Sequence, residues 1–126
     1  MSTPVAPTRL ARAAGLSVLG LGLVHVVELP AHTEVAAYLG LLFAVATVGF
    51  LGAAAWLWFG RHFGAGVLAG SLSVLALGAQ VVSLTFGLPG ARELRGEPTP
   101  AGLVAVALEV ATVVLLWLDR RSFRQD

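Results

Sequence analysis

Four long apolar stretches fill most of this chain of 126 residues. Each holds about 20 residues, the length at which an α-helix crosses a hydrocarbon layer of about 30 Å. Hydrophobic residues make up 57% of the chain and charged residues only 12%, which leaves no material for a soluble domain. Backbone groups in lipid must be paired within the spanning segment itself, so the sequence predicts an all-α fold. We expect one integral membrane domain over residues 1–126, a four-helix transmembrane bundle that runs up, down, up and down.

Capping residues and prolines set the expected limits of the spans. Thr8 is suited to cap the first helix, and Pro30 to end it, because the residue before a proline is pushed out of the helical region. Thr33 is suited to cap the second helix, and Thr99 followed by Pro100 to start the fourth. The predicted spans cover residues 9–29, 34–59, 64–86 and 100–118. The first two are then joined by a tight turn at the outer surface.

The positions of the eight arginines predict the orientation. Six would lie at the membrane surface that carries the two termini, and two in the loop after the third span. The first group is Arg9, Arg12, Arg61, Arg120, Arg121 and Arg124, and the second is Arg92 and Arg95. By the positive-inside rule both termini face the cytoplasm, with the arginines as surface anchors and not as a nucleic-acid site. Abundant alanine, glycine and arginine without lysine, asparagine or isoleucine is typical of a high-GC bacterium, so we expect a bacterial cytoplasmic (inner) membrane.

Several classes of chemistry have no support in the residues. The chain contains no cysteine, which excludes disulfides, thiolate metal sites and thiol catalysis. No Ser/His/Asp triad and no phosphate-binding loop can be assembled, since the glycines lie inside apolar helices. We therefore expect a protein that is not an enzyme.

The segment from His25 to His32 ends the first apolar stretch and carries the strongest functional signal. Ionisable side chains inside a bilayer are costly, so each is by default a candidate site. On a helix, His25, Glu28 and His32 would share one face, and Glu109 of the fourth span would lie in the same outer half of the bilayer. Imidazole and carboxylate groups are ligands of zinc, iron and manganese, so these four residues form a hypothetical site for one divalent transition metal. Three further polar residues could support it: Gln80, Ser83 and Glu34.

Two other interpretations of the same residues stay open. In the first, the role is structural: Glu109 is protonated or shares a proton with His25, and bonds to Gln80 or Ser83. In the second, the same groups form a proton or ion relay. All three interpretations require imidazole and carboxyl groups from the first and last spans to meet in the outer half of the bilayer.

Several short motifs resemble a known group of proteins. They are the pair His25 and His32, then Gly40-Leu-Leu-Phe43, then Gly87-Leu-Pro89, with Glu97 and Glu109 after it. This pattern resembles an uncharacterised group of small four-span membrane proteins of high-GC bacteria. The resemblance implies the four-span architecture and a shared outer polar cluster, and it implies no activity.

The functional expectation is a small integral membrane protein that acts as an accessory or ligand-binding subunit, with its His/Glu cluster in the outer half of the bilayer. The alternative is a small proton- or ion-coupled transporter that works as a homo-oligomer. Besides the lipid bilayer, the expected partners are further copies of the chain or a larger membrane complex. The Gly66-x-x-x-Gly70 motif fits such contacts, although it also serves packing within one bundle.

Overall fold

The computed structural model describes residues 6–60, 63–92, 95–96 and 98–123, without the side chains of residues 122 and 123. Over these residues the chain forms four helices and no strand. They are α1 (Arg9–Val35), α2 (Ala37–Phe59), α3 (Phe63–Thr85) and α4 (Pro100–Phe123). Each is long and apolar enough to cross a membrane. The predicted all-α bundle of four membrane-spanning helices is therefore confirmed.

Two of the predicted helix caps are present. The side-chain oxygen of Thr8 accepts a hydrogen bond from the backbone N–H of Ala11 at 3.0 Å, and α1 begins at the next residue. In the same way Thr99 Oγ1 accepts from the N–H of Gly102 at 3.0 Å, at the start of α4. Each cap pairs one of the backbone donors that the first helical turn leaves without a partner.

The predicted end of the first helix is wrong, because α1 continues through Pro30 as far as Val35. Ala36 is extended, with φ −157°, and α2 begins directly after it. The expected turn over residues 30–33 is therefore helical, and both His32 and Glu34 belong to α1. Helix α1 is longer than the expected span by more than one turn.

Near Pro30, two side chains donate hydrogen bonds to backbone carbonyls of α1. Thr33, predicted to cap the second helix, instead donates its hydroxyl to the carbonyl of Leu29 at 2.7 Å. His32 Nδ1 donates to the carbonyl of Glu28 at 2.9 Å. Proline is tolerated inside membrane helices where nearby side chains make such bonds and the surrounding helix is packed against a neighbour. The prediction that α1 ends at Pro30 used only the conformational preference of the residue before a proline, and it did not take these contacts into account.

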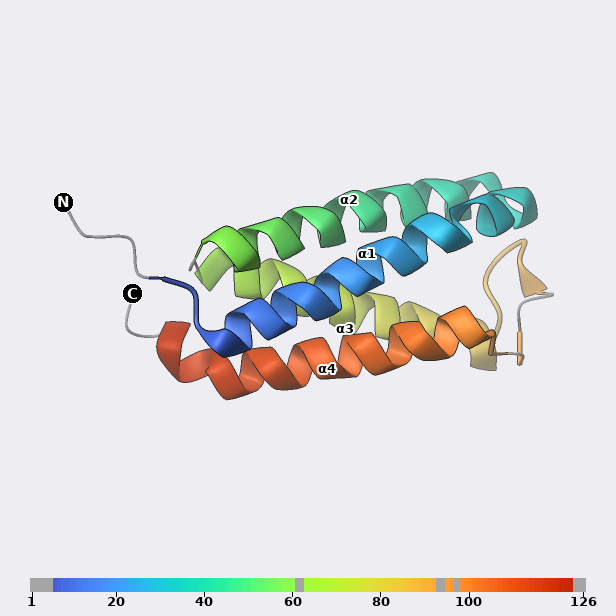
Figure 1. Cartoon of the computed structure of the whole chain (residues 1–126). Helices are drawn as coiled ribbons and strands as arrows, with labels where there is room; N and C mark the ends of the chain where they lie inside the picture. The colour runs from blue at the N-terminus through green and yellow to red at the C-terminus, as the bar shows by residue number, and fades with distance from the viewer. Residues whose placement is uncertain (1–5, 61–62, 93–94, 97, 124–126) are drawn as a thin grey trace.

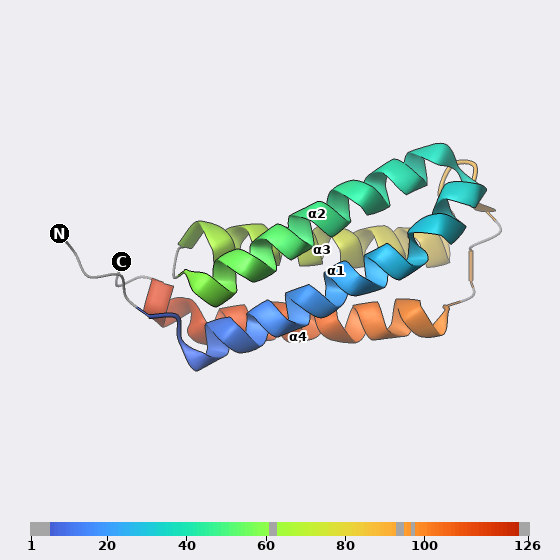
Figure 2. The ribbon, with the colours of Figure 1, turned by 45° about the horizontal axis from the view of Figure 1, so that its top comes forward.

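Consecutive helices run antiparallel, and both termini lie at the same end of the bundle (Figures 1 and 2). Helices α1 and α2 approach most closely. At Gly40 an added Cβ would collide with the side chain of Thr33, and at Gly22 it would lie 2.7 Å from Leu51 Cδ2. In lipid no hydrophobic force drives helices together, so their association depends on van der Waals contact. Small residues allow the close approach that this contact needs. The α1–α2 hairpin is thus the tightest part of the fold.

The core is centred on this hairpin and receives little from α3. Its largest fully buried apolar side chains are Val18, Leu21, Leu39, Phe50 and Leu57, all from α1 and α2. Helix α3 buries only Ala65, Ala69 and Ser73 of its 23 residues. Because these three residues are small and lie in one half of the helix, α3 is held by few side-chain contacts. Elsewhere the bundle exposes large apolar side chains, as lipid contact requires.

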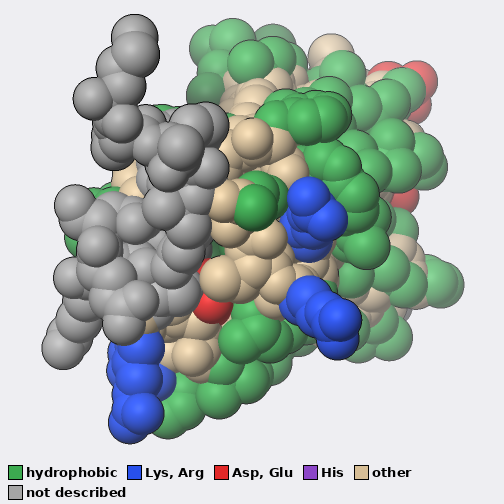
Figure 3. Space-filling model, turned by 60° about the vertical axis from the view of Figure 1, so that its left-hand side comes forward, with side chains coloured by type: hydrophobic (Ala, Val, Ile, Leu, Met, Phe, Trp, Pro, Cys, Tyr) green, Lys and Arg blue, Asp and Glu red, His purple; other side chains and the backbone are tan. Residues whose placement is uncertain are grey.

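The end of the bundle that carries the termini is rich in arginine (Figure 3). The arginines described there are Arg9, Arg12, Arg120 and Arg121. Two of them lie over tryptophan rings: Arg12 at 5.7 Å from the ring centre of Trp58, and Arg120 at 3.8 Å from that of Trp117. Cation–π pairs of this kind suit a membrane surface, where the guanidinium can stay in water while the tryptophan ring lies against apolar groups.

The loop at the opposite end is anchored to two helices. Arg95 Nε donates to the carbonyl of Thr85 at 2.9 Å, and the hydroxyl of Tyr38 donates to the carbonyl of Pro89. Gly87 takes a φ of +79°, a conformation that side chains disfavour, so the chain can turn sharply at the end of α3. The loop therefore returns the chain to the start of α4.

Candidate functional site

The two histidines of α1 form a ladder with two phenylalanines of α2. His25 lies with its ring centre 5.0 Å from Phe43 and 5.0 Å from Phe50, and His32 stacks on Phe43 at 3.9 Å. Both pairs are seven residues apart, His25 with His32 and Phe43 with Phe50, so each helix contributes a ring every two turns. The rings therefore alternate along the α1–α2 interface. We call these four residues the His–Phe ladder.

Hydrogen bonds fix the tautomer of each imidazole. His25 Nδ1 lies 2.8 Å from the carbonyl oxygen of Leu21, and His32 Nδ1 lies 2.9 Å from that of Glu28. A carbonyl oxygen only accepts, so Nδ1 carries the hydrogen in both rings and, in the neutral imidazole, Nε2 keeps its lone pair. Both rings are thereby tied to their own helix, four residues back.

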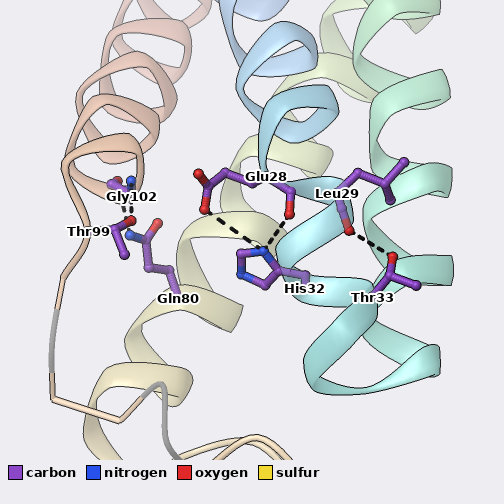
Figure 4. Close-up of polar contacts among 7 residues, drawn as sticks. All are labelled: Glu28, Leu29, His32, Thr33, Gln80, Thr99 and Gly102. Atoms are coloured by element: carbon purple, nitrogen blue, oxygen red, sulfur yellow. Dashed lines mark hydrogen bonds and ion pairs between the residues drawn. The ribbon is translucent and has the colours of Figure 1, made fainter.

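Glu28 and His32 lie beside each other near the end of α1 (Figure 4). Glu28 Oε2 lies 3.9 Å from His32 Nδ1, and the two side chains are 23% and 20% exposed. Glu34 is exposed on the last turn of α1. The predicted shared face of α1 is therefore real for Glu28 and His32, and a pair with this exposure contributes at most about 1 kcal/mol.

Glu109 lies elsewhere in the bundle. It is 1% exposed, and its Oε2 has no hydrogen-bond partner among the residues that the structure describes. Thr8 bonds to Asp119 at 3.0 Å, and Leu108 packs over Gly20. This antiparallel register puts Glu109 level with residues 18 and 19 of α1.

His25 is level with residues 102 and 103 of α4 in the same register, so it lies about 10 Å farther along the bundle than Glu109. None of the described hydrogen bonds or ion pairs joins the two residues. The register therefore gives no support to the predicted meeting of the first and last spans at His25 and Glu109. The reason is the register of α1 against α4, because a shared half of the bilayer does not by itself bring two side chains within bonding distance.

The hypothetical metal site of His25, Glu28, His32 and Glu109 finds no support for the same reason. Among the described residues no group of three or more His, Asp or Glu side chains could hold a metal ion. Phe43 lies between the two imidazoles, which are two helical turns apart, so a single ion cannot reach both.

The supporting polar residues make other contacts. Gln80 Nε2 donates to the carbonyl of Gly102 at 3.0 Å and so joins α3 to the start of α4 (Figure 4). None of the described hydrogen bonds joins it to Glu109, for which the structural interpretation offered Gln80 or Ser83 as partner. Ser83 is partly buried on α3. Gln80 is therefore a contact between α3 and α4 near the end of the bundle opposite the termini.

Sequence reasoning missed three buried polar residues. Ser73 and Thr112 are 0% exposed, and Asp119 is 4% exposed. Thr112 donates to the carbonyl of Leu108 at 2.8 Å, whereas Ser73 Oγ has no hydrogen-bond partner. Their spacing in the sequence indicated this burial. On α3, Ala65, Ala69 and Ser73 recur every four residues, and on α4, Ala105, Glu109 and Thr112 follow at intervals of four and three. Both spacings are typical of the face that a helix turns toward its neighbours. The phenylalanines of the ladder were likewise detectable from their matching interval of seven.

Comparison of the chain with models of protein families, with curated proteins and with solved structures found no match.

Proposed function

We propose that this protein is an accessory subunit of a membrane assembly and binds a transmembrane helix of its partner between α3 and α4. The observation that carries the proposal is a groove of about 360 Å³ between these helices. Its walls include Gly66, Gly70, Val74, Val113 and Leu116. Lipid-facing grooves formed by glycine and branched side chains allow the close approach on which helix association in membranes depends.

The weak attachment of α3 supports the same role. A helix with three buried residues among 23 is stabilised little by its own bundle, and a partner helix would supply the missing contacts. At the terminal end of the groove, Arg120 donates to the carbonyl of Trp117 at 2.6 Å and covers its ring. A partner with an acidic side chain at this membrane surface would complement the guanidinium.

The test fills the groove without disturbing the bundle. At Gly70 an added Cβ would meet only Leu116 Cδ1, at 3.7 Å, so Gly70→Leu leaves the bundle intact and projects into the groove. The matched control is Gly78→Leu on the same helix, where an added Cβ has no atom within 4 Å. We expect Gly70→Leu to lower the size of the complex extracted from the native membrane in mild detergent, and Gly78→Leu to leave it unchanged. An unchanged complex in both variants would contradict the proposal.

Transport is a second candidate, favoured by Glu109. A buried carboxyl with an oxygen lacking a partner is a common feature of proton pathways in membranes. Purified protein in liposomes, loaded with a pH-sensitive dye, would distinguish the two functions. Proton or solute flux that disappears in Glu109→Gln supports transport, whereas no flux above that of empty liposomes leaves the accessory role.

A further inference from the structure

The inward face of α4 is unusually polar for a membrane helix. It carries Glu109, Thr112 and Asp119 in succession, all at most 4% exposed. Thr112 is paired with a backbone carbonyl of its own helix, and Asp119 accepts from Thr8 at the terminal end. Glu109 differs, because its Oε2 is buried without any hydrogen-bond partner. A carboxylate oxygen in that position is unfavourable unless a proton or a ligand compensates it.

A second buried oxygen without a partner lies on the adjacent helix. Ser73 Oγ is fully buried and makes no hydrogen bond. Two contacts fix the register of α3 against α4: Gln80 bonds to Gly102, and Leu116 faces Gly70. Interpolation between them places Ser73 level with Thr112, one helical turn from Glu109. Two polar atoms without partners therefore occupy neighbouring levels of the interior.

No opposite charge faces Glu109 from any of the surrounding helices. On α1 the nearest ionisable residues are Arg12 and His25, each about 10 Å away along the bundle in opposite directions. Helix α2 has only Tyr38, at its outer end, and α3 has no ionisable residue. On α4 the nearest is Asp119, ten residues toward the terminal end. A carboxylate here would have no counter-charge, so the neutral acid is the stable form.

We infer that Glu109 is a reversible proton-binding site in the middle of the bundle. Water can gain access through α3, the helix with fewest buried side chains, because local opening begins where few contacts hold an element. The site does not depend on whether the protein is an accessory subunit or a transporter. It requires only that Glu109 gains and loses a proton.

Dicyclohexylcarbodiimide, an apolar reagent that partitions into membranes, probes such a site directly. A protonated carboxyl adds across one C=N bond of the reagent: the carboxyl oxygen bonds to the central carbon, and the acid proton moves to nitrogen. The acyl group then migrates from oxygen to nitrogen, which gives a stable N-acylurea without a leaving group. Carboxyls at the membrane surface are ionised at neutral pH and react slowly.

The experiment uses the full-length protein in liposomes, with the labelled residue identified by peptide mass mapping. We expect one main adduct at Glu109 at neutral pH, with a rate that falls about tenfold per pH unit once the carboxyl is mainly ionised. Labelling should disappear in Glu109→Gln and persist in the control Glu28→Gln. A water-soluble, cationic carbodiimide should not label Glu109.

Site mapping on the unsubstituted protein keeps the test independent of how well a variant folds. Adducts spread over Glu28, Glu34 and Glu109 at equal rates would overturn the inference. A Glu109 rate that does not change with pH would do the same, because it would show a carboxyl that never exchanges its proton.

Discussion

At the scale of single residues, the histidines are best understood through their neighbours. His25 has an aromatic ring of α2 on each side and a backbone carbonyl for its Nδ1 hydrogen, so its polar and apolar parts are both satisfied. His32 repeats the arrangement two turns later with one ring and partial exposure. The ladder thus explains two histidines in a membrane helix without a metal. Its main contribution is to the contact between α1 and α2.

Substitution of His25 separates ring packing from hydrogen bonding. His25→Ala leaves a cavity between two phenylalanine rings, and we expect it to lower the free energy of unfolding by about 2–4 kcal/mol. His25→Phe keeps an aromatic ring and loses only the bond to Leu21, so a loss of about 1 kcal/mol is expected. Equilibrium unfolding of the purified protein in mixed micelles measures both. If His25→Phe were as destabilising as His25→Ala, the hydrogen bond and not the ring would dominate.

At the scale of helices, the packing of α1 on α2 depends more on how closely the two helices approach than on the polarity of their faces. The end of α1 packs on α2 at Gly40, where an added Cβ would collide with Thr33. Gly52 lies on the same helix, and an added Cβ there has no atom within 4 Å. The two glycines therefore differ in whether another helix lies against them.

This difference gives a matched pair of substitutions. Gly40→Ala should separate the ends of α1 and α2 and lower stability by about 1–3 kcal/mol, as overpacking does. Gly52→Ala should leave stability unchanged or raise it by up to about 1 kcal/mol, because alanine favours helix more than glycine. Thermal unfolding followed by circular dichroism in detergent would show both changes. Equal effects at the two positions would mean that the α1–α2 contact is looser than described.

The helices themselves could be predicted well where the determining contacts are local. Thr8 and Thr99 cap their helices as expected, since a cap needs only its own backbone two or three residues ahead. Pro30 was mispredicted because the helix around it is supported by side-chain bonds and by packing on α2. The site was harder, since whether Glu109 meets His25 depends on the register of α1 against α4. Registers of this kind are set by contacts such as Leu108 over Gly20, which a single sequence does not contain.

At the scale of the whole molecule, one end of the bundle carries the described arginines (Figure 3), and the opposite end carries the anchored loop, so the two ends differ in chemistry. The positive-inside rule assigns the arginine-rich end to the cytoplasm, and this orientation stays a prediction. The absence of cysteine makes the chain well suited to test it, because any single introduced thiol is unique.

The test places one thiol at each end. Ala6 precedes α1 and Pro98 precedes α4, and both are exposed. In intact cells, a membrane-impermeant maleimide should label Pro98→Cys, whereas Ala6→Cys should react only after the membrane is permeabilised. Labelling of Ala6→Cys alone in intact cells would invert the orientation, and equal labelling would indicate a mixed population.

The tight hairpin of α1 and α2 also has a consequence for biosynthesis. Its stabilising contacts, including the His–Phe ladder, all lie within residues 9–59, so they can form before the second half of the chain leaves the ribosome. The first two helices can then enter the bilayer as a hairpin that is already packed. Helix α3 is synthesised later, so under the proposed accessory role the partner helix would bind after the α1–α2 hairpin has formed.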